Sequence, residues 1–209
     1  MQEVKILDKL EKYSQLERAA LQLDALIQTE ADKLSAGDRP EPELPTASPG
    51  GDVFFTTSVL GMNAISHVIE DQAMTMGQAV RFYASFQKFS RVQPQQARYR
   101  QLLAAHIPVY LFGIADAPLW EDPCLKPVTL SSPTRPGQPS LTHNWFVVLN
   151  NPQFVSMALV GRELPNSTKP LHAPDKLLYR NFEGFWTYDK AVIGQVVEIL
   201  DDYIKRRNV

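Results

Sequence analysis

A proline-rich stretch near the N-terminus constrains how this chain can fold. Residues 36–52 hold four prolines and end in a glycine pair followed by an acid, and they show no apolar periodicity. Such a composition is typical of a linker or a long extended loop. We therefore expect three parts: an N-terminal amphipathic helix over residues 1–35, a linker over residues 36–52 and a globular domain over residues 53–209.

The segment before the linker is predicted to be one long helix. Residues 3–35 contain no proline or glycine, and apolar side chains recur every three or four positions from Ile6 to Leu34. Two arrangements satisfy this pattern: a helix that packs on its own domain, and a helix that pairs with a second copy of the chain. The second arrangement would give a homodimer.

The body of the chain mixes strand-like and helix-like runs. Apolar side chains occupy every second position from Val80 to Phe86, which indicates a strand covered on one face. The apolar runs 144–151 and 153–163 flank Pro152 and predict a hairpin. We predict an α+β fold, with a mixed or antiparallel sheet of about four or five strands that is covered by helices.

Composition excludes several classes of protein. A net charge of -2 and a pI near 6.1 disfavour nucleic-acid binding, which needs a basic surface. Cys124 is the single cysteine, so an internal disulfide and a cysteine-based metal cluster are both excluded. No apolar run approaches the roughly 20 residues of a membrane span, and the N-terminus is too charged for a signal peptide. We expect a cytoplasmic protein without a membrane segment.

The motifs of common catalytic sites are missing. The sequence contains neither a glycine-rich phosphate loop nor the G-x-S-x-G pattern of serine hydrolases. The stretch "HVIED" would place His67, Glu70 and Asp71 on one side of a helix, but no second cluster of ligands accompanies it. A solvated helix face is the preferred interpretation. We predict no enzymatic activity and no metal site, and the sequence leaves any cofactor unknown.

Two polar clusters are candidates for binding. The first places Gln87, Arg91, Arg98 and Arg100 around a predicted strand end and helix start, where an anion or an acidic group would find donors. The alternative is that these arginines stack on Tyr99 or pair with surface acids. On a helix, positions 98 and 100 differ by about 200°, so a given site receives one of them. We favour Arg98.

The second cluster lies in "RNFEGFWTYDKAV", residues 180–192. If the chain is extended as far as Trp186, then Phe182 and Trp186 share one face and belong to the core. Glu183 then points to the opposite face and is left for recognition. Thr187 or Asp189 is expected to cap the final helix.

Several short motifs resemble the DICT sensory domain. "ASFQKFSRV", "ARYRQLLA", "VYLFGI", "NWFVVL", "ALVGRE" and "RNFEGFWTYDKAV" occur in its order and approximate spacing, over about Val53 to Leu200. The resemblance implies an α+β sensory or interaction module associated with diguanylate cyclases and two-component systems, for which a role in light responses has been proposed. It assigns neither a ligand nor catalytic residues. The residues that match its signature are Glu70, Asp71, Phe86, Gln87, Arg98, Tyr99, Arg100, Trp145, Phe182, Glu183, Trp186, Thr187 and Asp189.

The resulting hypothesis is a non-enzymatic bacterial signalling module that senses a small molecule or binds a protein partner, in a light or stress response. The alternative is a chromophore- or ligand-binding protein, or a small enzyme, that uses the cluster around Glu183 and Trp186. Because DICT domains are commonly fused to an output domain, we expect output through a partner, through oligomerisation or through residues 1–35. The predicted binding residues are Glu70, Asp71, Gln87, Arg98, Arg100, Trp145, Glu183, Trp186 and Asp189.

Overall fold

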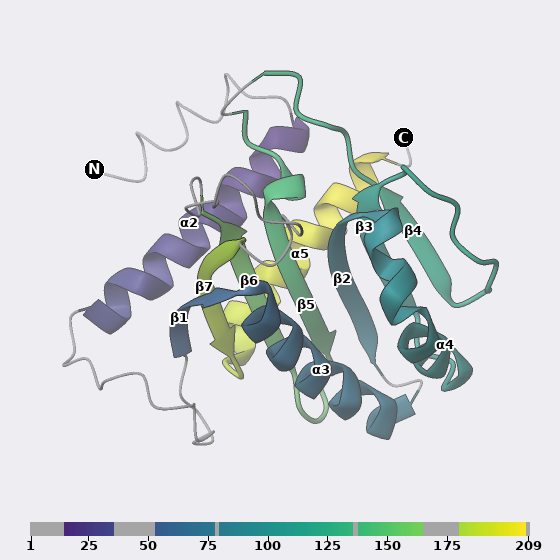
Figure 1. Cartoon of the computed structure of the whole chain (residues 1–209). Coiled ribbons are helices and arrows are strands. Elements are labelled where there is room, and N and C mark those ends of the chain that lie inside the picture. The colour runs from purple at the N-terminus through teal and green to yellow at the C-terminus, as the bar shows by residue number, and fades with distance from the viewer. Residues whose placement is uncertain (1–14, 36–52, 78–79, 136–137, 165–179, 208–209) are drawn as a thin grey trace.

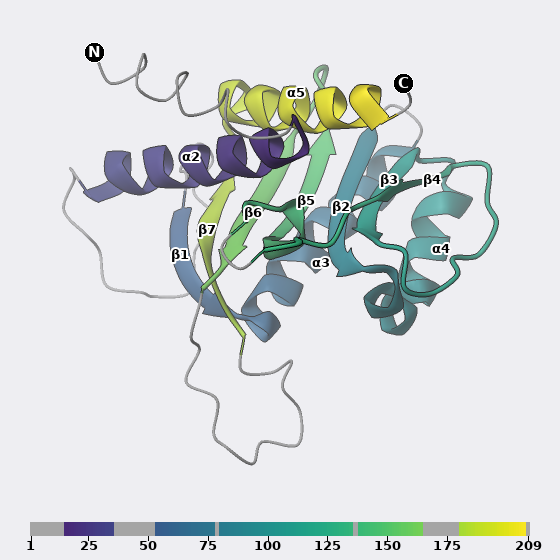
Figure 2. The same cartoon turned by 90° about the horizontal axis from the view of Figure 1, so that it is seen from above.

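The computed structural model describes residues 15–35, 53–77, 80–135, 138–164 and 180–207 (Figure 1). The predicted linker, residues 36–52, and the first half of the predicted N-terminal helix lie outside these residues. The described elements form three layers, with one sheet between two layers of helices (Figure 2).

Among the helices of the described residues, two lie on each face of the sheet. One face carries α2 (Gln15–Ser35) and α5 (Lys190–Arg207), and the other carries α3 (Val59–Met76) and α4 (Gln96–Ala104) (Figure 2). Two 3₁₀ helices, η2 (Phe89–Gln95) and η3 (Leu141–His143), precede α4 and β5 respectively. None of the helices that the structure describes is both long and apolar enough to cross a membrane.

The sheet is mixed and has seven strands within the described residues, so the prediction of about four or five was wrong. Its order is β1-β7-β6-β5-β2-β3-β4, antiparallel from β1 to β2 and parallel from β2 to β4. The two edge strands, β1 and β4, are short and bury few side chains, which weakens their sequence pattern. The strand bounds are β1 Val53–Ser58, β2 Arg81–Lys88, β3 Val109–Ile114, β4 Leu125–Thr129, β5 Asn144–Asn150, β6 Met157–Glu163 and β7 Asn181–Thr187.

The strand β2 is covered on both faces, which corrects the expectation of one covered face. Phe82 and Ala84 are buried against α3 and α4, whereas Tyr83 is buried against α5. The tyrosine can occupy a buried position because its hydroxyl reaches the periphery of that layer and donates to Asp201 of α5 over 2.9 Å. Because tyrosine ends in a polar hydroxyl, the sequence pattern assigned Tyr83 to the polar face of β2, although its ring is buried.

Two hydrophobic cores lie on the two sides of the sheet. On β5, Val147 and Leu149 belong to the core under α3 and α4, and Phe146 and Val148 to the core under α2 and α5. The alternation follows from the period of two residues in a strand. Every second residue of the central strands therefore contributes its side chain to the same core.

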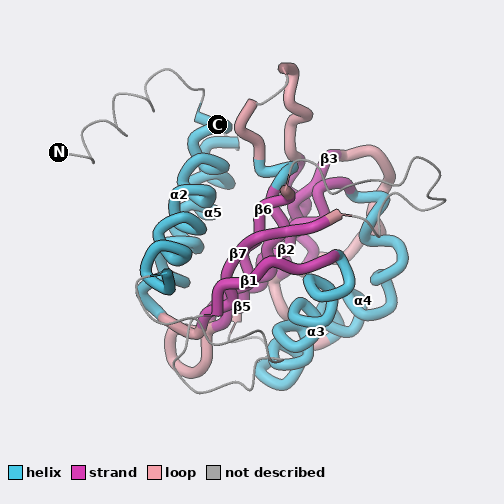
Figure 3. The backbone as a smooth tube through the Cα atoms, turned by 60° about the vertical axis from the view of Figure 1, so that its left-hand side comes forward, coloured by secondary structure: helices cyan, strands magenta, loops and turns pink. Residues whose placement is uncertain are grey.

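The helix α2 packs on its own sheet, beside α5 (Figure 3). Its buried apolar side chains face the core that it shares with α5; they are Ala19, Ala20, Leu23, Leu26 and Ile27. This packing is the first of the two arrangements that the sequence allowed. Pairing of two chains through this helix stays a prediction.

The strands β5 and β6 form the predicted hairpin. The connection is longer than expected, because residues 151–156 all lie outside the strands. Asn151 organises it: its side-chain oxygen accepts from the backbone N–H groups of Gln153, over 3.1 Å, and Phe154, over 3.3 Å. Phe154 is left exposed at the turn.

Candidate functional site

An ion-pair cluster joins α3 to α4, and we call Glu70, Asp71, Arg98 and Tyr99 the Glu70–Arg98 cluster. Arg98 reaches from α4 to α3, where Nε donates to Glu70 and Nη2 donates to Asp71. The same Nη2 donates to the backbone carbonyl of His67 over 2.7 Å. The hydroxyl of Tyr99 donates to the second oxygen of Glu70 over 3.1 Å. Both carboxylate oxygens of Glu70 are therefore held by α4.

The members of this cluster differ sharply in exposure. Glu70 is 3% exposed, whereas the side chain of Asp71 is 65% exposed. Burial raises the pKa of the Glu70 carboxyl, and the hydrogen bonds from Arg98 and Tyr99 oppose that rise. Burial also raises the pKa of Tyr99 well above its usual value, and the neighbouring Glu70 raises it further. The expectation of a solvated face was wrong for Glu70.

A small cavity of ≈ 10 Å³ adjoins the cluster. Such a volume holds about one water molecule. Several polar groups line it: Ser66, His67, Glu70, Ser85, Tyr99 and Trp145. The indole N–H of Trp145 donates to the hydroxyl of Ser66 over 3.2 Å, and Nε2 of His67 is buried without a hydrogen-bond partner among the described residues. Within that same part of the chain, no group of His, Cys, Asp and Glu has the geometry of a metal site.

A second polar cluster lies at one end of the sheet, and we call Gln87, Arg91, Glu163 and Arg180 the Gln87–Arg180 cluster. The end of β2, the end of β6 and the residue before β7 meet there because of the strand register. Arg180 binds Glu163 with two nitrogens, over 2.6 and 2.5 Å. The guanidinium groups of Arg91 and Arg180 both donate to the side-chain oxygen of Gln87.

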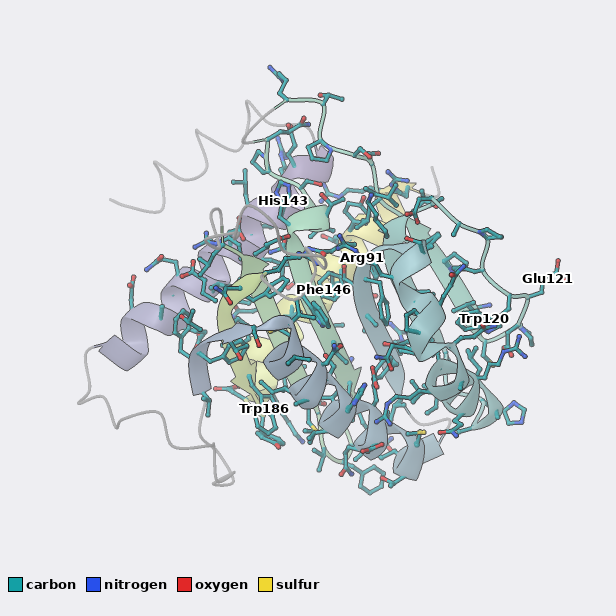
Figure 4. All side chains as sticks on the ribbon, in the orientation of Figure 1. Arg91, Trp120, Glu121, His143, Phe146 and Trp186 are labelled. Atoms are coloured by element: carbon teal, nitrogen blue, oxygen red, sulfur yellow. The ribbon has the colours of Figure 1, made fainter. Side chains whose placement is uncertain are left out.

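Gln87 stands at an irregular point of the backbone. Its φ of 63° is left-handed, and the pairing of β2 with β3 shifts register between Ser85 and Gln87. Residues other than glycine rarely adopt such a φ, and residues that are held in this conformation cluster at functional sites. Figure 4 shows Arg91 over the same end of the sheet.

The charges of this cluster are partly buried. Arg180 is 7% exposed, and its guanidinium carbon lies 5.1 Å from the ring centre of Phe182. Burial lowers the pKa of the Arg91 guanidinium, as does the positive charge of Arg180. Burial alone would raise the pKa of Glu163, but the bonds from Arg180 and Gln87 lower it below its usual value.

Arg100 lies apart from both clusters, as its position two residues after Arg98 predicted. It is exposed, and its guanidinium carbon lies 5.8 Å from the ring centre of Trp120. Trp120 lines a shallow surface pocket of ≈ 790 Å³ with residues of the β3–β4 connection. In Figure 4, Trp120 lies beside α4, and Glu121 points into solvent.

The C-terminal candidates divide between the two faces of β7. Trp186 is buried on the side of α3, and Phe185 on the side of α2 and α5. Glu183 shares the latter face and accepts from Arg162, which lies 4.0 Å from Asp24 of α2. The alternation predicted for this segment is confirmed, but Glu183 and Trp186 do not meet in one pocket. The face of Glu183 is also a core, because α2 covers it.

The end of this segment starts the last helix as predicted. Asp189 caps α5: its side-chain oxygen accepts from the backbone N–H of Ala191 over 2.7 Å. The backbone of β6 approaches Gly184 closely, since a Cβ there would lie 2.1 Å from the carbonyl oxygen of Val160.

Neither Glu163 nor Arg180 is among the binding residues predicted from the sequence. Both are charged residues at the boundary of a strand, one at the end of β6 and one just before β7. An acid and an arginine at the facing ends of two antiparallel strands are a usable signal only when the pairing of those strands is known. That pairing was not predicted, because the two strands are separated by a long connection.

A comparison with protein families matches residues 43–163 to DICT, a sensory domain in diguanylate cyclases and two-component systems. The comparisons with curated proteins and with solved structures returned no match. The match includes both acids of the Glu70–Arg98 cluster and Arg98 itself, and it ends before Arg180, Glu183, Trp186 and Asp189. It spans more than half of the chain, which thus belongs to the DICT family of sensory domains.

Proposed function

We propose that this chain is a non-enzymatic signalling module in which a small molecule or a protein partner changes the contact between α3 and α4. The family description supports a sensory role. The observation that carries the proposal is Glu70, a carboxylate 3% exposed, held by Arg98 and Tyr99 beside a small cavity.

This arrangement is costly for a purely structural contact. A buried ion pair is often no more stable than apolar side chains of the same volume, because both charges lose their water. Removing one partner alone leaves an uncompensated charge and is strongly destabilising. The contact between α3 and α4 therefore favours either the complete cluster or a state in which Glu70 reaches water, which is the behaviour of a two-state element.

The cluster can be reached from outside through its exposed members. Arg98 is 22% exposed at its side chain and Asp71 is 65% exposed. An acidic group of a partner can replace Asp71 at Arg98 while Glu70 keeps its own bond to the same guanidinium. We therefore expect the bound molecule to carry a carboxylate or a similar anionic group.

The proposal is tested by affinity capture from native lysate, with mass spectrometry of both proteins and small molecules. The variant to compare is the double substitution Glu70→Gln/Arg98→Met, which removes both charges together and leaves neither unpaired. Arg100→Met is the matched control, since it removes an exposed arginine from the same helix. We expect the wild-type chain and the control to capture the same molecule and the double variant to lose it. Equal capture by all three would contradict the proposed site.

The involvement of light is a separate part of the proposal and needs a bound chromophore. Glu183 and Trp186 lie on opposite faces of β7, so the single pocket imagined for them is not favoured. An absorption spectrum of the purified protein is the direct measurement. A visible band would support a light response, and a colourless preparation would remove it from the proposal.

A further inference from the structure

The Gln87–Arg180 cluster holds more positive charge than negative charge. Arginine stays protonated at neutral pH, and Glu163 is ionised because its pKa is lowered. Glu163 is engaged by two nitrogens of Arg180. Arg91 has only the neutral amide oxygen of Gln87 as a hydrogen-bond acceptor among the described residues.

The surrounding charges do not cancel this excess. Lys88 adds a positive charge, and Asp116 adds a negative one that accepts from Ser90 over 2.7 and 2.9 Å. The negative charges of Glu163 and Asp116 both act on Arg91 from a distance. With three cations and two acids, one positive charge remains at a site where two guanidinium groups are partly or fully withdrawn from water.

The backbone holds the donors in place. The amide oxygen of Gln87 accepts from both guanidinium groups, which brings the two like charges together in spite of their repulsion. Gln87 does so from a left-handed φ at an irregularity of β2. A half-buried arginine whose partner is neutral, next to a second arginine that is fixed by its own carboxylate, is a preorganised receptor for an anion.

We infer that the Gln87–Arg180 cluster binds a phosphate group, either as inorganic phosphate or as part of a small phosphorylated molecule. A phosphate carries about 1.5–2 negative charges at neutral pH, which is enough to offset the one positive charge that remains at the site after Lys88 and Asp116 are counted. Its oxygens match the paired N–H donors of a guanidinium. Arg91 makes the contact, and Arg180 and Gln87 orient it. This site is separate from the Glu70–Arg98 cluster and does not depend on the function proposed there.

The test is calorimetric titration of the full chain at neutral pH. Inorganic phosphate and AMP are the two probes, each added to about 10 mM, and sodium chloride of equal ionic strength is the blank. Tighter binding of AMP would assign the site to a phosphorylated molecule, and equal or tighter binding of inorganic phosphate would assign it to the free anion. Failure of both probes to bind would overturn the inference.

Three variants locate the binding. Arg91→Met should weaken phosphate binding at least about tenfold, the effect of losing one charge-assisted contact. Arg91→Lys should recover part of the affinity, because it restores the charge without the planar pair of donors. Arg100→Met is the control and should bind like the wild type. Equal dissociation constants for Arg91→Met and the wild type, with unchanged melting curves, would show that the phosphate lies elsewhere.

Discussion

The Glu70–Arg98 and Gln87–Arg180 clusters are built from the same types of side chain with opposite excess charge. The first places two acids around one arginine, and the second places two arginines around one acid. In the first, the surplus acid is Asp71, which is largely in solvent. In the second, the surplus cation is Arg91, which is half-buried and has a neutral partner.

The two clusters therefore differ in whether their surplus charge is stabilised by water. Water solvates the surplus charge of the Glu70–Arg98 cluster, so its charges are already satisfied, and an anionic ligand binds there only by displacing Asp71 from Arg98. The surplus charge of the Gln87–Arg180 cluster is partly removed from water, so an anion improves its environment. Removing a charge should thus destabilise the protein where the charge is matched and have little effect where it is in surplus.

The largest effect is expected for Arg180→Met. The substitution removes both bonds to Glu163 and the contact with Phe182. Breaking a buried ion pair from one side costs about 3–5 kcal/mol, and the lower part of that range applies because the Glu163 side chain keeps some access to water. Unfolding in urea measures the loss.

Arg91→Met provides the comparison within the same cluster. It removes the surplus cation and its repulsion with Arg180, so the free energy of unfolding should change by less than about 0.5 kcal/mol. Similar losses for the two substitutions would mean that Arg91 is as well matched as Arg180, and the distinction between the clusters would fail.

The free energy of unfolding should fall by about 2–3 kcal/mol for Arg98→Met, which leaves the charge of Glu70 unpaired in the α3–α4 contact. The double variant Glu70→Gln/Arg98→Met should regain at least about 1 kcal/mol of the lost stability, because the unpaired carboxylate of Glu70 is replaced by a neutral amide. Unfolding of wild type, both single variants and the double variant gives the coupling between the two side chains. If the double variant is no more stable than Arg98→Met, the charge of Glu70 is not the source of the loss.

The sequence predicted the fold class and most elements because their patterns are local. The alternation in "FEGFWT" placed Phe182 and Trp186 on one face, and Asp189 was recognised as a cap from its position before an apolar helical stripe. The family motifs singled out Glu70, Asp71 and Arg98 without indicating that they touch. Contacts between helices that are separated by a strand are not local, so no spacing rule reports them.

The assumption of one covered face per strand also limited the prediction. It led us to treat Glu183 as a residue free for recognition, whereas α2, which is distant in sequence, covers that face of β7. The apolar pattern of α2 is compatible both with packing on its own sheet and with pairing with a second chain, so the pattern alone did not predict which face α2 covers.

Asp189→Ala supplies a reference outside both clusters. It removes the acceptor for the backbone N–H groups of Ala191 and Val192 at the start of α5. Loss of such a cap typically costs about 1 kcal/mol. The melting temperature should fall by less than for Arg98→Met. A larger fall would mean that the start of α5 matters more to stability than the buried ion pair does.

A small effect is also expected for Glu70→Gln, and its dependence on pH is more informative than its size. Glutamine keeps an acceptor for Tyr99 and leaves Arg98 paired with Asp71, so the free energy of unfolding at neutral pH should change by less than about 1 kcal/mol.

The sign of the pH effect follows from the raised pKa of Glu70. Between the unfolded value, near 4.5, and the higher folded value, the folded protein binds more protons than the unfolded chain. The contribution of Glu70 to stability is therefore complete below pH 4.5 and is lost as the pH rises through the folded pKa.

Urea unfolding of wild type and Glu70→Gln across this pH window isolates the effect. Asp24, whose pKa is raised by burial, and Glu163, whose pKa is lowered, titrate in both proteins and cancel in the difference. The variant should gain stability relative to the wild type as the pH rises, because its neutral amide never has to ionise. If it instead loses stability with rising pH, the bonds from Arg98 and Tyr99 outweigh the burial of the charge. Glu70 would then be a structural anchor of α4, and the α3–α4 contact would lose its character as a two-state element.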